Sequence, residues 1–277
     1  MTTPDSPSIL DLGERTGSSS RSARPSCLAL HGLGGGPYEL GPVIAALEAE
    51  GLHVAAPTLP GHEGPGPIMP SSRWRDWADA TEAAFEGLAA AGAPVVVIGF
   101  STGGTLALHL AARRPVARLV LLAPFLGIRY SRLIPMRPAT YLRHLARLIP
   151  NLRRRPPAVR DPAMRHQVAA AACYRTFSLG ATLSALELID EVKPLVPGIS
   201  TPTLIIQGKL DTVVEPRDAA WLHDQLGAGH KVLVILPRSD HVVAVDRDRD
   251  RVIALTREFV LGGGSTVPKK PPLTALE

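Results

Sequence analysis

A serine, an aspartate and a histidine stand at three separate places where the sequence predicts a strand running into a turn. Ser101 lies in the pentapeptide 99–103, Gly-Phe-Ser-Thr-Gly, between an apolar run at 94–98 and a helix-like run at 105–112. A sharp strand-to-helix turn holds its serine in a strained backbone conformation and lifts the hydroxyl clear of the sheet. A hydroxyl presented in this way can attack a carbonyl carbon once a base removes its proton.

The pentapeptide alone does not establish this chemistry. A chain with 25 glycines contains such spacings by chance, and a glycine-rich helix entry explains the string equally well. The strand before Ser101 and the helix after it favour the catalytic interpretation, because that structural context is what the turn requires. Partners for the serine elsewhere in the chain are therefore the deciding feature.

Two later strand ends supply those partners in the order serine, acid, histidine. Asp211 follows a predicted strand at 203–207, and His241 follows another at 231–236. The carboxyl ends of parallel strands meet at the sheet edge where open α/β sheets build their sites, so we expect both side chains to lie near Ser101. His241 would act as the base, and Asp211 would orient its ring and stabilise the imidazolium.

Other residues compete for these roles. Nine histidines occur, but only His241 comes directly after the last strong strand in the required chain order. Glu215 and Asp240 are the other candidate acids. Glu215 precedes Pro216 and is typical of a helix start, while Asp240 adjoins His241 and should point away from its ring. Asp211 is therefore the predicted acid.

A glycine-rich turn at 31–36 follows the predicted strand 27–30 and could supply part of an oxyanion hole. The backbone N–H groups of Leu33 and Thr102 are the predicted donors. A phosphate-binding loop is the competing interpretation, but neither G-x-G-x-x-G nor G-K-[ST] spacing follows. We expect His31 to be a structural hydrogen-bonding residue beneath this turn.

These motifs together, in this order, resemble the α/β-hydrolase superfamily, and more narrowly the bacterial carboxylesterases and monoacylglycerol lipases. The resemblance extends from about residue 27 to 260. It is carried by His31-Gly32 with its glycine run, Leu59-Pro60-Gly61-His62, Trp74-Arg75-Asp76-Trp77, the serine pentapeptide, Gly208-Lys209-Leu210-Asp211 with Val213-Val214, and Ser239-Asp240-His241-Val242. Glu63 and Thr102 depart from residues common in relatives, so the resemblance leaves substrate preference open.

The resemblance implies an α/β-hydrolase fold, with a mostly parallel central sheet, helices on both faces and a helical cap. It also implies hydrolysis of small-molecule or lipid-like carboxylic esters through an acyl-enzyme, without a metal or organic cofactor. A thioesterase, a carbon–carbon bond hydrolase or an acyltransferase would use the same three side chains, and these alternatives stay open. A ligand-binding member of the fold without turnover is a further alternative. A halide-releasing enzyme is disfavoured, because such enzymes carry an aspartate where Ser101 stands.

Length and composition predict one domain with flexible ends. The 277 residues are 45% apolar, enough for one sizeable core. We expect residues 1–25 to be disordered or loosely attached, 26–261 to form the domain and 262–277 to be a flexible tail.

The polar start carries no signal-peptide core. Cys27 and Cys173, expected in a strand and a helix, are interpreted as buried apolar residues. A cytoplasmic location is the expectation.

An insertion at about 127–197 should form the cap over the substrate. Residues expected to line an apolar acyl site are Phe125, Leu126, Leu133, Val213 and Val242. Between residues 127 and 166 the chain carries ten arginines and one acid. Two interpretations stay open: a solvated surface whose predicted amphipathic helix at 141–149 covers the pocket, or weak contact with an anionic membrane surface or acidic substrate. Nucleic acid is disfavoured, because aromatic residues make up only 4% of the chain.

Overall fold

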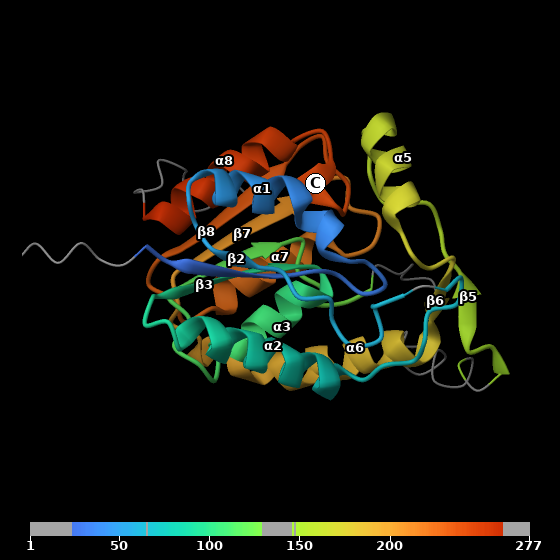
Figure 1. Ribbon diagram of the computed structural model, residues 1–277, viewed down its shortest axis with the longest axis horizontal. Helices are drawn as coiled ribbons and strands as arrows, with labels where there is room; N and C mark the ends of the chain where they lie inside the picture. Colours follow the sequence, from blue (N-terminus) through green and yellow to red (C-terminus); the bar gives the residue numbers. More distant parts are fainter. Residues whose placement is uncertain (1–23, 65, 129–145, 147, 263–277) are drawn as a thin grey trace, which may run out of the picture.

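Six parallel strands form the centre of the protein, in the order β2-β1-β3-β4-β7-β8 (Figure 1). The computed structural model describes residues 24–64, 66–128, 146 and 148–262. The strands are β1 (Ser26–Leu30), β2 (Val54–Ala55), β3 (Val95–Phe100), β4 (Arg118–Leu122), β7 (Thr203–Gly208) and β8 (Lys231–Leu236). The predicted mostly parallel sheet is confirmed.

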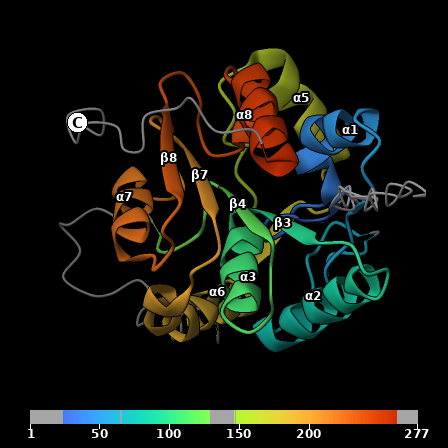
Figure 2. The ribbon, with the colours of Figure 1, turned by 90° about the vertical axis from the view of Figure 1, so that its left-hand side faces the viewer.

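Helices cover both faces of this sheet (Figures 1 and 2). Helices α1 (Gly41–Ala49) and α8 (Arg249–Leu261) lie on one face. The other face carries α2 (Trp74–Ala89), α3 (Thr102–Ala111), α6 (Leu179–Val192) and α7 (Pro216–Gln225). Short 3-10 helices are η1 (Pro37–Leu40), η2 (Lys193–Gly198) and η3 (Val243–Val245).

The central strands are apolar at nearly every position because each strand is buried on both faces. In β1, Cys27 and Ala29 pack toward α1 and α8, while Leu28 and Leu30 pack toward α2 and α3. Strands of this kind appear in sequence as continuous apolar runs rather than alternating ones. This explains why β1, β3, β7 and β8 could be predicted from the sequence to within two residues.

A small unit lies beyond the carboxyl edge of the sheet (Figure 1). It consists of the antiparallel strands β5 (Asn151–Arg153) and β6 (Thr176–Ser178) and helix α5 (Pro162–Ala171). Asp161 begins α5 by accepting hydrogen bonds from two backbone N–H groups of its first turn. Helix α6, by contrast, packs with α2 and α3 in the core under the sheet.

Several sequence predictions fall outside the described residues. Leu133 and most of the predicted helix at 141–149 belong to this group, as do residues 1–23 and 263–277. None of the helices in the described residues combines the length and the apolar character of a membrane-spanning helix. The same residues contain no group of three or more side chains arranged to hold a metal ion.

The prediction for the second cysteine is wrong. Cys27 is buried in β1 as expected, but Cys173 is exposed and follows the end of α5. Helix α5 lies at the surface and buries only Val168. In the segment that leads from α5 to β6, the side chain that enters the core is that of the next residue, Tyr174, which is 4% exposed.

Candidate active site

Ser101 lies at the junction of β3 and α3 with φ 52° and ψ −118°, a conformation rarely adopted by a residue with a side chain. Hydrogen bonds on both sides hold it there. Its N–H donates to the Leu122 carbonyl at 3.0 Å, and its carbonyl accepts from Gly104 at 2.9 Å and Phe125 at 3.0 Å. The strained turn predicted for Ser101 is therefore present and fixed by its neighbours.

Close approach of two backbones explains the glycine after the serine. A Cβ at Gly103 would overlap the carbonyl groups of Leu30 and His31, at the end of β1. The first turn of α3 can lie against that strand end only because position 103 has no side chain. The turn at 31–36 is consequently held beside the amino end of α3.

The structure brings the three predicted side chains together. The Ser101 hydroxyl lies 2.9 Å from Nε2 of His241, and Nδ1 of His241 lies 2.8 Å from Oδ2 of Asp211. All three residues are buried, with Asp211 0% exposed. In the neutral tautomer that fits these contacts, Nδ1–H donates to Asp211 and Nε2 accepts from the Ser101 hydroxyl.

Asp211 is surrounded by donors that favour its ionised form. Its Oδ1 accepts from the backbone N–H groups of Val213 and Val214, each at 2.8 Å. Its Oδ2 also accepts from Nε2 of Gln207 at 2.8 Å. Burial raises the pKa of Asp211, but His241 and these N–H groups outweigh it, so the pKa lies below its usual value. Gln207 was not predicted as a site residue, although a polar residue near the end of an apolar strand signals such a role.

The pKa of His241 is shifted in the opposite direction to that of Asp211. Burial lowers its pKa, but Asp211, with smaller contributions from Glu39 and Asp240, raises it above the usual value. The ring also packs against Phe100 at a centroid distance of 5.1 Å. The site therefore stabilises the imidazolium that forms when His241 accepts a proton.

The two predicted oxyanion donors are the backbone N–H groups of Leu33 and Thr102. Among the described residues, no acceptor is recorded for the N–H of Leu33 or of Thr102. Thr102 begins α3, where the helix dipole favours negative charge. His31 lies beneath the turn as expected: its ring bonds the Gly32 carbonyl at 2.8 Å and accepts from Leu59 N–H at 3.0 Å. Burial lowers the pKa of His31 to about 4, so its ring is neutral.

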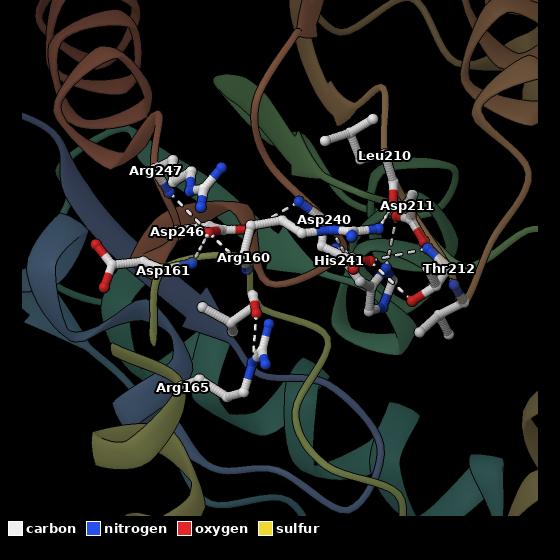
Figure 3. Close-up of polar contacts among 12 residues, drawn as sticks. Arg160, Asp161, Arg165, Leu210, Asp211, Thr212, Asp240, His241, Asp246 and Arg247 are labelled. Carbon is white, nitrogen blue, oxygen red and sulfur yellow. Dashed lines mark hydrogen bonds and ion pairs between the residues drawn. The ribbon is translucent and has the colours of Figure 1, made fainter. Parts of the chain in front are cut away.

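Asp240 serves a separate network (Figure 3). Its Oδ1 accepts from the N–H and hydroxyl of Thr212 and from the N–H of His241, at 2.8–2.9 Å. Its Oδ2 forms an ion pair with Nε of Arg160 at 3.1 Å. Buried Asp246 accepts from the N–H groups of Asp240 and Arg160 at 2.7 and 2.8 Å. Asp240 thus ties the segment before α5 to the loops of the site without facing the His241 ring.

The residues predicted to line an acyl site are placed unevenly. Phe125, Leu126 and Val242 are buried, and Val213 is 37% exposed. Phe125 adjoins Ser101 through its backbone, and Val242 N–H donates to Ala158 at 3.2 Å, beside the unit beyond the sheet edge. Leu133 lies outside the described residues.

Comparisons with known proteins agree with this architecture. The family described as serine aminopeptidase, S33 (Hydrolase_4) matches residues 21–248. A thermostable monoacylglycerol lipase of Bacillus sp. (strain H-257) is 26% identical over 233 residues, covering 84% of this chain and 88% of that protein. A pimeloyl-(acyl-carrier protein) methyl ester esterase of Neisseria meningitidis serogroup B / serotype 15 (strain H44/76) is 29% identical over 254 residues, covering 84% and 92%.

A solved structure shows the same fold. This structure comes from work on LipS and LipT, two metagenome-derived lipolytic enzymes. It matches this chain with a TM-score of 0.77 and 23% sequence identity. The match covers 86% of this chain and 94% of that chain. The resemblance to the α/β-hydrolase superfamily is confirmed.

Proposed function

The chain belongs to the Hydrolase_4 family (serine aminopeptidase, S33) of the α/β-hydrolase superfamily, and on this premise we propose that it hydrolyses carboxylic esters through an acyl-enzyme on Ser101. Its relatives are named as lipases and esterases, and the chain is an ester-hydrolysing enzyme. The proposed substrates are those of a carboxylesterase or monoacylglycerol lipase. The observation that carries the proposal is the line of contacts from Ser101 to His241 at 2.9 Å and on to Asp211 at 2.8 Å.

In the proposed reaction His241 accepts the Ser101 proton as Oγ attacks the ester carbonyl. The Leu33 and Thr102 N–H groups hold the tetrahedral oxyanion, a contribution of about 3 kcal/mol for each donor in comparable sites. The intermediate collapses, and His241 passes its proton to the departing alcohol. A water molecule, deprotonated by His241, then attacks the acyl carbon. The bond to Oγ of Ser101 breaks, the acid is released, and His241 returns its proton to Oγ. Asp211 stays ionised throughout and keeps the ring oriented.

Removing the nucleophile tests the proposal. We expect Ser101→Ala to lower kcat for a p-nitrophenyl ester by about 10⁴-fold or more, because no oxygen remains for the acyl group. Ser71→Ala is the matched control, since Ser71 is exposed and no hydrogen bond of its side chain is recorded among the described residues. Turnover by Ser101→Ala at the rate of the control would refute the assignment.

The ester reaction is preferred over the other reactions that the same side chains support. A panel of p-nitrophenyl esters of increasing chain length, a monoacylglycerol, a thioester, a vinylogous diketone and an aminoacyl anilide separates them. We expect the highest kcat/KM with an ester. The best chain length would then report the size of the acyl site.

Of the described residues in the predicted cap at about 127–197, β5, α5 and β6 are proposed to form the cap, since α6 packs under the sheet instead of over its edge. The remaining parts of 26–261 would form the catalytic domain.

Cys27 and Cys173 form no disulfide, which fits the proposed cytoplasmic location.

Weak contact with an anionic membrane surface is part of the proposal. Arginine side chains line a hollow of about 940 Å³ between α5 and the segments that join it to β5 and β6. They include Arg153, Arg165 and Arg175. Within the described residues no ion pair is recorded for these three side chains, so their charges are available to a lipid surface.

A further inference from the structure

We propose that Glu39 and Arg154 are positioning residues that hold the turn at 32–36, here called the oxyanion turn, in its reactive shape, so that the oxyanion hole is complete only when the β5–β6 unit is seated. This inference rests on the proposed function. Neither residue was predicted from the sequence. The two side chains reach the turn from different segments, Glu39 from η1 and Arg154 from the residue that follows β5.

Glu39 holds the turn from the inside. It belongs to η1, directly after the turn, and is buried, with 4% of its surface exposed. Its Oε2 accepts from the Gly32 N–H at 3.0 Å. A Cβ at Gly35 would collide with this carboxylate, so the glycine run leaves the space that the carboxylate fills. The shape of the turn and the position of Glu39 therefore require each other.

Arg154 holds the turn from the outside. Its Nη1 donates to the Gly34 carbonyl at 2.5 Å, and its guanidinium lies 5.7 Å from the centre of the Phe177 ring. Phe177 in β6 also lies against Gly34, where a Cβ would come within 3.2 Å of the ring. Arg154 N–H donates to the Arg175 carbonyl at 2.9 Å, which fixes its backbone to the segment before β6. When the β5–β6 unit is seated, the side chains of Arg154 and Phe177 therefore both lie on the turn.

Leu33 connects these contacts to the proposed ester hydrolysis. The contacts of Glu39 with Gly32 and of Arg154 with Gly34 are here called the clamp. Its N–H, one of the two proposed oxyanion donors, lies between Gly32, bonded by Glu39, and Gly34, bonded by Arg154. A donor that shifts out of line loses much of its stabilisation of the oxyanion, because hydrogen bonds weaken steeply with angle. Holding both neighbours of Leu33 is therefore a means of aiming its N–H.

Charge links the clamp to His241. Burial raises the pKa of Glu39 to about 7, while Arg154, the Gly32 N–H and His241 oppose that rise. Tyr38, its neighbour in η1, is a further titratable group that interacts with both Glu39 and Arg154. In turn, the Glu39 carboxylate contributes to the raised pKa of His241. Removing that negative charge should lower the pKa of His241.

Steady-state kinetics with a soluble ester test the proposal on the full chain. We expect Arg154→Ala to lower kcat by about 10- to 100-fold with KM within about 2-fold, because only the transition state carries the oxyanion. Arg154→Lys should recover part of the loss, since an ammonium can still donate to the Gly34 carbonyl. Glu39→Gln should lower kcat and move the half-maximal pH of kcat/KM to lower values. The double variant should lose less than the product of the two single losses.

Arg73→Ala is the charge-matched control, because Arg73 is exposed and no side-chain partner is recorded for it among the described residues. Wild-type kcat in Arg154→Ala, or single losses that multiply in the double variant, would overturn the clamp. If Arg154→Ala fails to fold, Arg154→Lys and hydrogen exchange of the peptide carrying the turn decide, with faster exchange in Arg154→Lys expected and unchanged exchange contradicting. If the wild type hydrolyses no ester, the proposed function fails, and that exchange measurement still tests the clamp separately.

Discussion

At the scale of single residues, the site depends on a lowered pKa for Asp211 and a raised pKa for its neighbour His241. His241 and the N–H groups of Val213 and Val214 lower the pKa of Asp211 and keep it ionised, and Asp211 in turn raises the pKa of His241. His241 can accept the Ser101 proton only when its ring is neutral. The proposed activity should therefore rise with pH as His241 loses its proton, with a midpoint above the usual value of 6.5 for this group.

Asp211→Asn should change this profile in a defined direction. Without the carboxylate the imidazolium loses its main stabilising charge, so the pKa of His241 falls and the midpoint of kcat/KM moves to lower pH. We also expect kcat at the plateau to fall by about 10⁴-fold, because the ring loses its orienting partner. The measurement is kcat/KM for a soluble ester across pH.

Asp250→Asn is the control for this experiment, since Asp250 lies on the exposed side of α8. It should leave both the midpoint and the plateau unchanged. An Asp211→Asn enzyme with the wild-type midpoint would show that Asp211 does not set the pKa of His241.

At the scale of elements, three strand ends bring the site together. Ser101 follows β3, Asp211 follows β7 and His241 follows β8, and all three strands run in the same direction within one sheet. Chain positions up to 140 residues apart therefore meet at one edge, as Ser101 and His241 do. The network around Asp240 and Asp246 extends this arrangement to the segment before α5.

These strands could be predicted because burial on both faces leaves an unbroken apolar run in the sequence. The runs at 27–30, 203–207 and 231–236 coincide with β1, β7 and β8 to within a residue. Strand β5 has no such signal: Leu152 and Arg153 are exposed, and its pairing with β6 depends on residues more than 20 positions away. Periodicity cannot reveal a strand of three residues that carries no buried apolar run.

The same reason separates the predicted side chains from the missed ones. Ser101, Asp211 and His241 each follow a strong strand, so local patterns indicate their place. Arg154 acts on Gly34 across 120 positions of chain, and nothing in the row of three arginines at 153–155 distinguishes the middle one. Glu39 likewise looks like an ordinary acid of a short helix until its burial is known.

At the scale of the whole molecule, the charge is unevenly distributed. The chain carries a formal net charge of +5, and the arginines around the hollow beside α5 form a basic area. Electrostatic attraction of such an area to anionic lipids is weak, long-ranged and screened by salt. The proposed membrane contact should show all three properties.

Vesicle sedimentation tests this proposal. We expect binding to vesicles of phosphatidylcholine with phosphatidylglycerol, loss of that binding at high salt, and little binding to phosphatidylcholine alone. Arg165→Glu with Arg175→Glu should abolish it, while the exposed pair Arg217→Glu with Arg251→Glu, on α7 and α8, should retain it. Equal and negligible binding to both kinds of vesicle would end the proposal.

Mass spectrometry of the enzyme quenched during turnover of a p-nitrophenyl ester tests the acyl-enzyme itself. We predict that the wild-type protein gains the mass of one acyl group, that the adduct maps to the peptide carrying Ser101, and that Ser101→Ala gains none. Continued ester turnover with the acyl group found on another residue, or on none under conditions that slow deacylation, would contradict the account.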